Sequence, residues 1–262
     1  EPDELRSLRP NFTSLSMRYG ILDRLPEAFR TGLGIRWDDR GPRAAETTEN
    51  LFANWYRQVL VPVALPMLEG VVPALERGGR VMDVGCGTGL AMIEMAKAFP
   101  RAEFHGWEAS RQAIDLGRQR ALDAGTPNVL FHDIADESMP IEPSFDLVLT
   151  FDCLHDMARP HDAVAAIRRA IRPDGAWFIA DINGQPTFED NLDRNPLAAM
   201  MYAISVTSCM SSALSEPDGA GLGTLGRPEP AMRDLVTGAG FSRFRRIEQL
   251  QHPINAYYEA RL

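Results

Sequence analysis

The pattern of apolar and polar positions changes at Gly79. Between Thr48 and Leu75 the apolar residues recur at intervals of three, four, seven and eight, which predicts an amphipathic helix continued by a second helical piece after Pro62. After Gly79, short apolar runs alternate with amphipathic stretches, as in a series of β-α units. Repeated units of this kind predict a parallel, doubly wound sheet with right-handed crossovers.

The same pattern locates the individual elements. We expect strands at 80–84, 103–107, 129–131, 145–150 and 176–180, and helices at 90–99, 111–124, 162–171 and 230–238. The run Phe145–Thr150 is apolar at nearly every position, as expected for a strand covered on both faces. Two closing strands, at 241–247 and 256–262, are joined by a short link and should pair antiparallel. The sequence therefore predicts an α/β fold with a seven-stranded, mostly parallel sheet.

Two parts of the chain do not follow the β-α pattern. Residues 1–76 are predicted to form an N-terminal helical segment that acts as a substrate lid, and residues 77–262 form the main domain. Within the main domain, residues 182–229 mix Gly, Pro, Ser and Met irregularly and contain one helical patch at 197–204, which indicates an insertion. Because the sequence starts with Glu1 rather than methionine, we expect that residues upstream of it are missing.

The amino-acid composition indicates which binding partners and which cellular compartment to expect for this protein. The chain has 27 basic and 36 acidic residues, a net charge of −9 and no basic run, so a broad nucleic-acid-binding face is not expected. Its three widely spaced cysteines fit free thiols in a reducing cytoplasm. The most apolar stretch, residues 59–72, is too short and too interrupted to cross a bilayer. We expect a cytoplasmic protein without nucleic-acid or membrane partners.

A glycine-rich loop stands at the junction of the first predicted strand and helix. Gly85, Gly87 and Gly89 alternate with other residues there, so the backbone can turn tightly and a ligand can approach where a Cβ would clash. The helix that follows directs free N–H groups toward such a ligand. A dinucleotide fingerprint needs glycine or alanine at the position of Leu90, so the spacing favours a different nucleotide-like ligand.

Acidic residues follow the next three predicted strands. Glu108 ends the second strand, where its carboxylate can accept hydrogen bonds from both ribose hydroxyls. Asp133 ends the third strand and can bind an adenine amino group while Ile134 packs against the ring. Asp152 follows the fourth strand and can face a cationic amine or sulfonium. The alternatives are a solvated acid at Glu108, a turn-forming Asp133 and a helix-capping Asp152. No basic group for a phosphate is expected at this edge. A glycine loop with these acids would suit a nucleoside that carries a positive charge.

These motifs resemble those of class I S-adenosylmethionine-dependent methyltransferases. The resemblance covers about residues 78–262 and rests on the order DVGCGTG, Glu108, HDI, FDLVLTFDCLHD and IRPDG. It implies a Rossmann-like methyltransferase fold and S-adenosylmethionine as the cofactor. FRTGLG, CLHDM, SCMSSAL, GAGLGTLG and NAYYEAR are similar to a bacterial, largely mycobacterial-type group of these enzymes. Members of that group carry a small winged-helix-like N-terminal domain, which is not seen in this sequence, and we expect any homodimer to form through that missing domain.

The resemblance also implies a set of cofactor contacts. It assigns ribose binding to Glu108 with Ala109 beside it, adenine binding to Asp133 with Ile134, and contacts with the methionyl group to three further residues. The full set is Asp83, Gly85, Cys86, Gly87, Gly89, Glu108, Ala109, Asp133, Ile134, Phe151 and Asp152.

A base is required only for some acceptors. Methyl transfer is a direct displacement, so the protein mainly has to align the reactants and exclude water. An acceptor that must lose a proton needs a general base. His155 is the candidate, and the adjacent Asp156 is expected to orient its ring. The alternative is a structural histidine of the pocket wall or the start of a helix.

Oxygen ligands for a metal also occur at strand ends. Asp152, Asp181 and Asn183 could hold Mg²⁺, as in catechol-type O-methyltransferases. Isolated acids at strand ends are common, however, so we predict no metal.

The acceptor is predicted to be a small, apolar molecule. Tyr19 and Trp37 from the N-terminal segment, with Met201 and Tyr202 from the insertion, are candidates to line its pocket, because soft methionine-rich walls suit irregular hydrophobic molecules. The alternative is that most of these residues belong to the core. The predicted function is methyl transfer to an O, N, S or C nucleophile. The alternatives are a non-catalytic regulator that binds S-adenosylmethionine or S-adenosylhomocysteine, and an enzyme that uses the cofactor as a fixed cation for a rearrangement.

Overall fold

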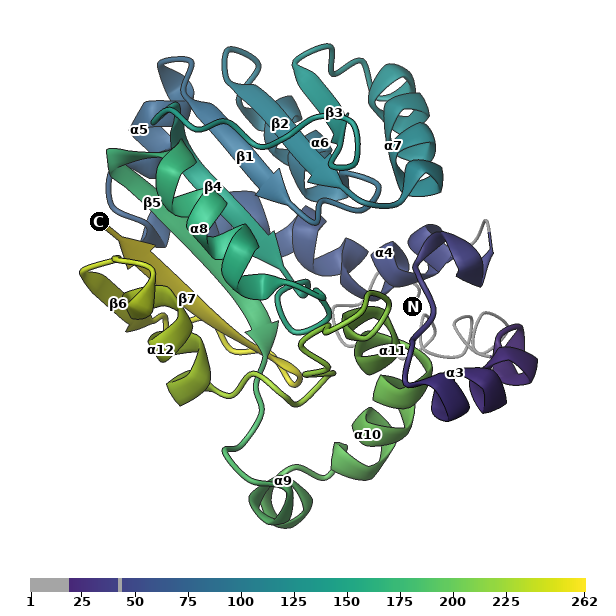
Figure 1. Ribbon diagram of the computed structural model, residues 1–262. Coiled ribbons are helices and arrows are strands. Elements are labelled where there is room, and N and C mark those ends of the chain that lie inside the picture. Colours follow the sequence, from purple (N-terminus) through teal and green to yellow (C-terminus); the bar gives the residue numbers. More distant parts are fainter. Residues whose placement is uncertain (1–18, 42–43) are drawn as a thin grey trace.

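A seven-stranded sheet forms the centre of the molecule (Figure 1). The computed structural model describes residues 19–41 and 44–262. The strand order is β3-β2-β1-β4-β5-β7-β6; the first five strands are parallel, and β7 is antiparallel to both β5 and β6. The strands are β1 (Arg80–Val84), β2 (Glu103–Glu108), β3 (Val129–Asp133), β4 (Phe145–Phe151), β5 (Ile171–Ile182), β6 (Arg243–Arg246) and β7 (Asn255–Arg261). The predicted fold class and the antiparallel closing pair are confirmed.

Helices cover both faces of the sheet. The helical elements are η1 (Leu22–Arg24), α3 (Leu25–Thr31), η2 (Asp38–Arg40), α4 (Ala44–Trp55), η3 (Tyr56–Ala64), η4 (Leu65–Met67), α5 (Val71–Glu76), α6 (Leu90–Ala98), α7 (Arg111–Asp123), α8 (Pro160–Ala170), α9 (Phe188–Arg194), α10 (Ala198–Thr207), α11 (Cys209–Ala213) and α12 (Glu229–Gly238). The stretch from α4 to α7 packs on one face with Val81 and Phe178, and α8 and α12 pack on the other with Met82 and Trp177. Consecutive strand residues thus enter opposite cores, which explains the continuous apolar runs.

Two elements differ from the sequence prediction. The helix expected to break at Pro62 continues through it as the π-helical segment η3. Proline lacks an N–H group, and a wider π-helical turn accommodates its ring without the usual α-helical hydrogen bond. Strand β5 begins at Ile171 rather than Ala176, because Ile171 pairs with Phe145 across a register shift in β4. The turn-like residues Pro173–Gly175, which follow the helix predicted at 162–171, therefore lie within the strand.

The insertion packs against the N-terminal segment. The Gly34 N–H donates to the Leu214 carbonyl (2.7 Å), and the Ile35 N–H donates to Ser211 Oγ (2.9 Å). The Arg40 guanidinium donates to two carbonyls at the end of α10. In Figure 1 this combined lid, made of residues 19–41 and α10–α11, lies beyond the carboxyl ends of β4 and β5. The predicted boundary at residue 76 stays a prediction.

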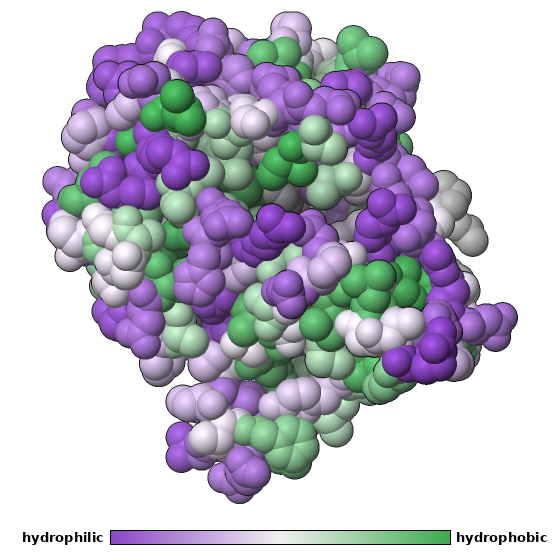
Figure 2. All heavy atoms as spheres, in the orientation of Figure 1, coloured by the Kyte–Doolittle hydropathy of each residue, from purple (hydrophilic) through white to green (hydrophobic). Residues whose placement is uncertain are grey.

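The surface over this lid differs from the rest of the same face. Figure 2 shows hydrophobic residues gathered over α11 and the segment that follows it, whereas the outer rim is mostly hydrophilic. Among residues 19–41 and 44–262, no helix combines the length and the apolar composition that crossing a membrane requires.

Candidate functional site

The glycine loop between β1 and α6 has one side open. Gly85, Gly87 and Gly89 all have positive φ (72°, 55° and 73°), which explains why glycine stands at each position. A Cβ on Gly85 would lie 2.8 Å from the Cβ of Cys153, and one on Gly89 would overlap the ring of Phe131. A Cβ on Gly87 would meet no atom within 4 Å. The outer glycines therefore serve packing, whereas Gly87 leaves free space beside the loop.

Glu108, at the end of β2, holds the glycine loop in place. One oxygen accepts a hydrogen bond from the Gly87 N–H (2.8 Å), and the other accepts from the N–H groups of Ala109 and Ser110 (both 2.9 Å). Burial raises the pKa of Glu108, although these three N–H donors partly offset the effect. The carboxylate thus lies directly beside the loop, where the sequence analysis expected a sugar-binding group.

Asp83 and Cys86 complete the floor of this part of the site. Asp83 is 2% exposed, and burial together with the charge of Glu108 raises its pKa to about 8. The Cys86 thiol packs onto β2, because a Cβ on Gly106 would overlap it. The Cys86 side chain is therefore directed toward β2, while its backbone forms part of the glycine loop.

A basic group that was not expected from the sequence, Arg111 at the start of α7, reaches the end of β3. Asp133, the register partner of Glu108, binds Arg111 Nε at 2.7 Å and accepts a hydrogen bond from the Ala135 N–H at 2.9 Å. Asp133 thus forms a turn, as in the alternative interpretation, while its position beside Glu108 keeps the adenine role open. The adjacent Ile134 is 43% exposed, so its side chain is available to a ring. Arg111 is matched by Asp133 and Asp136 and leaves no excess positive charge.

Asp38 from the N-terminal segment closes over this edge. Its carboxylate accepts hydrogen bonds from the Ser110 hydroxyl and from the Arg111 N–H (3.2 Å), at the start of α7. Neither Asp38 nor Arg111 was predicted from the sequence. Arg111 stands three residues after Glu108 and was a visible basic group near the site, whereas the approach of Asp38 depends on tertiary packing.

The carboxyl end of β4 combines a core residue with a strained one. Phe151 is 8% exposed and packs against Trp55 and Tyr56, so its ring belongs to the core. Asp152 has a φ of 53°, a conformation that costs on the order of 1–3 kcal/mol in a residue other than glycine and that concentrates at functional sites. Its carboxylate accepts a hydrogen bond from Asn255 Nδ2 (2.5 Å), and burial, followed by the charge of Asp181, raises its pKa to about 8.

His155 forms a buried pair with Asp181 from the end of β5. The distance from His155 Nδ1 to Asp181 Oδ1 is 2.5 Å, and the two side chains are only 3% and 1% exposed. Burial by itself lowers the pKa of His155, but Asp181 and the nearby Cys209 raise it well above its usual value. The residue that orients the ring is therefore Asp181 on the neighbouring strand, not the adjacent Asp156.

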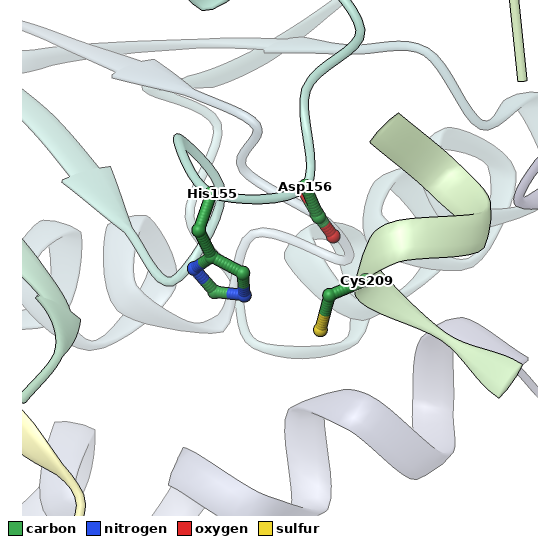
Figure 3. Close-up of side chains that lie close together, drawn as sticks. All are labelled: His155, Asp156 and Cys209. Atoms are coloured by element: carbon green, nitrogen blue, oxygen red, sulfur yellow. The ribbon is translucent and has the colours of Figure 1, made fainter. Parts of the chain in front are cut away.

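Cys209 and Asp156 lie on the other side of the His155 ring (Figure 3). Cys209 is the first residue of α11, so the insertion contributes directly to the site. Asp156 is 9% exposed, and burial raises its pKa to about 7. The SCMSSAL segment is recognisable as a motif in the sequence, but the contact between its cysteine and the candidate base was not predicted.

Buried polar atoms without a hydrogen-bond partner also occur close to this histidine. They include Asp181 Oδ2 and Asn255 Oδ1. An unpaired buried acceptor costs about 1–3 kcal/mol, so such atoms are retained where a ligand or a reaction uses them. From the sequence, Asp181 was predicted only as a possible metal ligand, and Asn255, which lies in the closing NAYYEAR segment, was not predicted at all.

The four residues predicted to line an acceptor pocket lie in different surroundings. Tyr19 is 68% exposed, and Met201 is 4% exposed in a small core formed by the insertion. Tyr202 packs near Phe188, with ring centroids 4.9 Å apart. Trp37 lies under the Arg40 guanidinium (4.5 Å), which binds the Ser208 carbonyl next to Cys209. Of the four, Trp37 is thus linked to the His155 region through Arg40.

Comparison with known families agrees with the fold. A model of the methyltransferase domain matches residues 75–218, which is more than half of the chain. The chain therefore belongs to the methyltransferase domain family. This match includes the glycine loop, Glu108, His155 and Cys209.

Individual relatives cover less of the chain or are more distant. A ubiquinone biosynthesis O-methyltransferase of Paracidovorax citrulli is 32% identical over 124 residues, which are 47% of this chain; the chain spans about half (50%) of the length of that curated relative. The structure of an O-methyltransferase family protein from Burkholderia thailandensis has a TM-score of 0.68 at 14% identity, covering 99% of this chain and 71% of that protein. Human N-acetylserotonin methyltransferase, solved in complex with S-adenosylmethionine, has a TM-score of 0.59 at 17% identity, covering 93% and 66%.

Proposed function

We propose that this chain transfers the methyl group of S-adenosylmethionine to a hydroxyl oxygen of a small, mostly apolar molecule, with His155 as the general base. The pairing of buried His155 with Asp181 carries the proposal, because a base is needed when the acceptor must lose a proton. The names of the relatives, which are O-methyltransferases, favour oxygen as the acceptor atom.

The residues at the glycine loop suit the proposed cofactor. The open side of Gly87 leaves room for a ligand against the backbone, and Glu108 offers a carboxylate to sugar hydroxyls. Ile134 presents an exposed apolar surface to a base, and Asp83 and Asp152 place acidic rather than basic side chains along this edge, which disfavours a phosphate. When bound, S-adenosylmethionine supplies an activated methyl group; the protein has to hold the acceptor in line with it and keep water out.

The His155–Asp181 pair is arranged for proton transfer. Asp181 holds Nδ1, so Nε2 is the nitrogen that can take a proton from an acceptor hydroxyl. The imidazolium that forms is stabilised by the same carboxylate, as in other histidine–aspartate pairs. Such base catalysis contributes about 10²–10⁴-fold in rate. Because the pKa of His155 is raised, the base form predominates only above that pKa.

The combined lid fits an apolar acceptor. It is held together through Arg40 and the Gly34–Leu214 hydrogen bond, and it places Cys209 beside His155. A lid of this kind excludes water from the reacting groups and favours acceptors with little polar surface.

We also infer a bacterial, cytoplasmic setting without a nucleic-acid partner. The three cysteines are free thiols, which fits a reducing compartment. The Paracidovorax relative is bacterial, and the net charge of −9 disfavours nucleic acid.

An acceptor panel tests this function. The full chain is incubated with methyl-labelled S-adenosylmethionine and matched small phenols, anilines and thiols, and labelled products are counted. We expect phenols to be methylated, and His155→Gln to lower turnover about 10²–10⁴-fold while the affinity for the cofactor stays near wild type. The matched control is His161→Gln, an exposed histidine of α8, which should keep full turnover.

Three outcomes would contradict the proposal. Exclusive methylation of anilines or thiols would exclude an oxygen acceptor. Unchanged turnover in His155→Gln would show that His155 is not the general base. Normal cofactor affinity with no transfer to any acceptor would favour the binding-protein alternative.

A further inference from the structure

Three different metal-binding side chains meet at the candidate base. His155, Asp156 and Cys209 each place a ligand atom within 4.8 Å of the other two (Figure 3). The first two come from the segment after β4, and Cys209 comes from the start of α11. The α11 helix therefore brings a thiol from the insertion to the end of the sheet.

The chemistry of these donors selects one class of cation. An imidazole nitrogen, a carboxylate oxygen and a thiolate sulfur together suit Zn²⁺ and other thiophilic divalent ions. Mg²⁺ prefers oxygen ligands only, so the thiol of Cys209 disfavours it. Three protein ligands leave the fourth tetrahedral position open, as in zinc sites that exchange a water molecule.

Asp181 supplies the outer support that metal-binding histidines usually have. Its carboxylate holds His155 Nδ1 at 2.5 Å, which leaves Nε2 as the nitrogen facing Cys209. A carboxylate behind a metal-binding histidine fixes the tautomer and the direction of the ring. Asp152 also lies beside this pair, because ligand atoms of Asp152, His155 and Asp181 lie within 4.8 Å of one another.

We propose that His155 Nε2, the Asp156 carboxylate and the Cys209 thiolate bind a thiophilic divalent cation such as Zn²⁺. Binding forms a metal–sulfur bond, and the thiol proton leaves to solvent. This site differs from the Asp152–Asp181–Asn183 arrangement that would hold Mg²⁺. Because the cation occupies Nε2, it also removes the proposed base and inhibits methyl transfer reversibly; this second consequence rests on the proposed function, whereas binding of the metal does not.

Cobalt is the probe for the site itself. Co²⁺ is titrated into the metal-free full chain, and the thiolate-to-cobalt charge-transfer absorption is recorded. We expect one Co²⁺ per chain with such a band, displaced by Zn²⁺ but not by excess Mg²⁺. Cys209→Ser should lose the band, and the matched control Cys86→Ser should keep it, since the Cys86 thiol packs onto β2. No band in the wild type, or a band that survives in Cys209→Ser, would overturn the site.

A second variant tests the support from Asp181 without changing a ligand. Asp181→Asn should weaken Co²⁺ binding about 10-fold to 100-fold, whereas Asp174→Asn, an exposed position of the same strand, should not. Circular dichroism confirms that both variants are folded. Equal affinities in the two folded variants would contradict the proposed support.

Inhibition is measured separately. The Zn²⁺ concentration that displaces cobalt should abolish methyl transfer, and a chelator should restore it; full turnover in Zn²⁺-saturated protein would refute the inhibitory role. If Co²⁺ binds as expected while His155→Gln retains turnover, the metal site stands and the proposed function fails.

Discussion

The two halves of the strand edge are built in different ways. At the β1–β3 half, the Glu108 carboxylate is bound by backbone N–H groups close to it in the fold, including that of Gly87. At the β4–β5 half, side chains bind side chains from distant parts of the sequence: His155 binds Asp181, and Asp152 binds Asn255. The unpartnered buried oxygens of Asp181 and Asn255 belong to this second half.

This difference indicates separate tasks. The loop beside Glu108 is held by backbone hydrogen bonds, and the side-chain pairs Asp38–Ser110 and Asp133–Arg111 lie around it. A loop fixed by its own backbone suits a ligand that is always the same. A half built on paired, buried and partly unsatisfied side chains is sensitive to charge and protonation, which suits the reaction itself. We therefore expect changes in the first half to alter cofactor affinity, and changes in the second half to alter turnover.

The largest effect is expected at Gly87. Gly87→Val places a side chain in the open space beside the loop and should abolish cofactor binding in calorimetry. Gly125→Val is the matched control, because Gly125 also has positive φ and open space but lies between α7 and β3, away from the site. Both variants should lose similar thermal stability from backbone strain. Cofactor affinity at the wild-type level in Gly87→Val would mean that the pocket is elsewhere.

A smaller loss is expected at Glu108. Glu108→Gln keeps the shape of the side chain but removes its charge, and it should weaken cofactor binding by about 1–3 kcal/mol. Turnover at saturating cofactor should change little. Glu103→Gln, at the exposed start of the same strand, serves as the control. A variant with unchanged affinity but reduced turnover would reverse the division of tasks between the two halves.

The smallest of the three effects is expected in the pH dependence of turnover, which reports on the β4–β5 half alone. Because Asp181 and Cys209 raise the pKa of His155 above its ordinary value of 6.5, the protonated and inactive form persists into neutral solution. Turnover should therefore rise with pH and fall about tenfold per unit below the apparent pKa, as for a single-proton base. Stopped assays of methyl transfer at a series of pH values on both sides of neutrality measure this profile. A flat profile in the wild type, with the chemical step rate-limiting, would argue against a histidine base.

The sequence predicted the backbone-built half better than the other. The glycine loop and Glu108 follow strands whose apolar pattern is clear, so their meeting at one edge could be predicted from local order alone. The prediction that Asp156 orients the His155 ring was wrong. Asp156 is adjacent in the sequence, whereas Asp181 becomes a neighbour of His155 only when β4 and β5 pair. Cys209 and Asp38 reach the site through tertiary packing of the lid, which no local pattern encodes.

Calorimetric titration of the wild-type chain with S-adenosylhomocysteine, and in parallel with NAD⁺, tests the central claim most directly. We expect saturable binding of one S-adenosylhomocysteine per chain and no binding of the diphosphate-bridged dinucleotide. Binding of NAD⁺ in its place, or no heat of binding from either ligand, would contradict it.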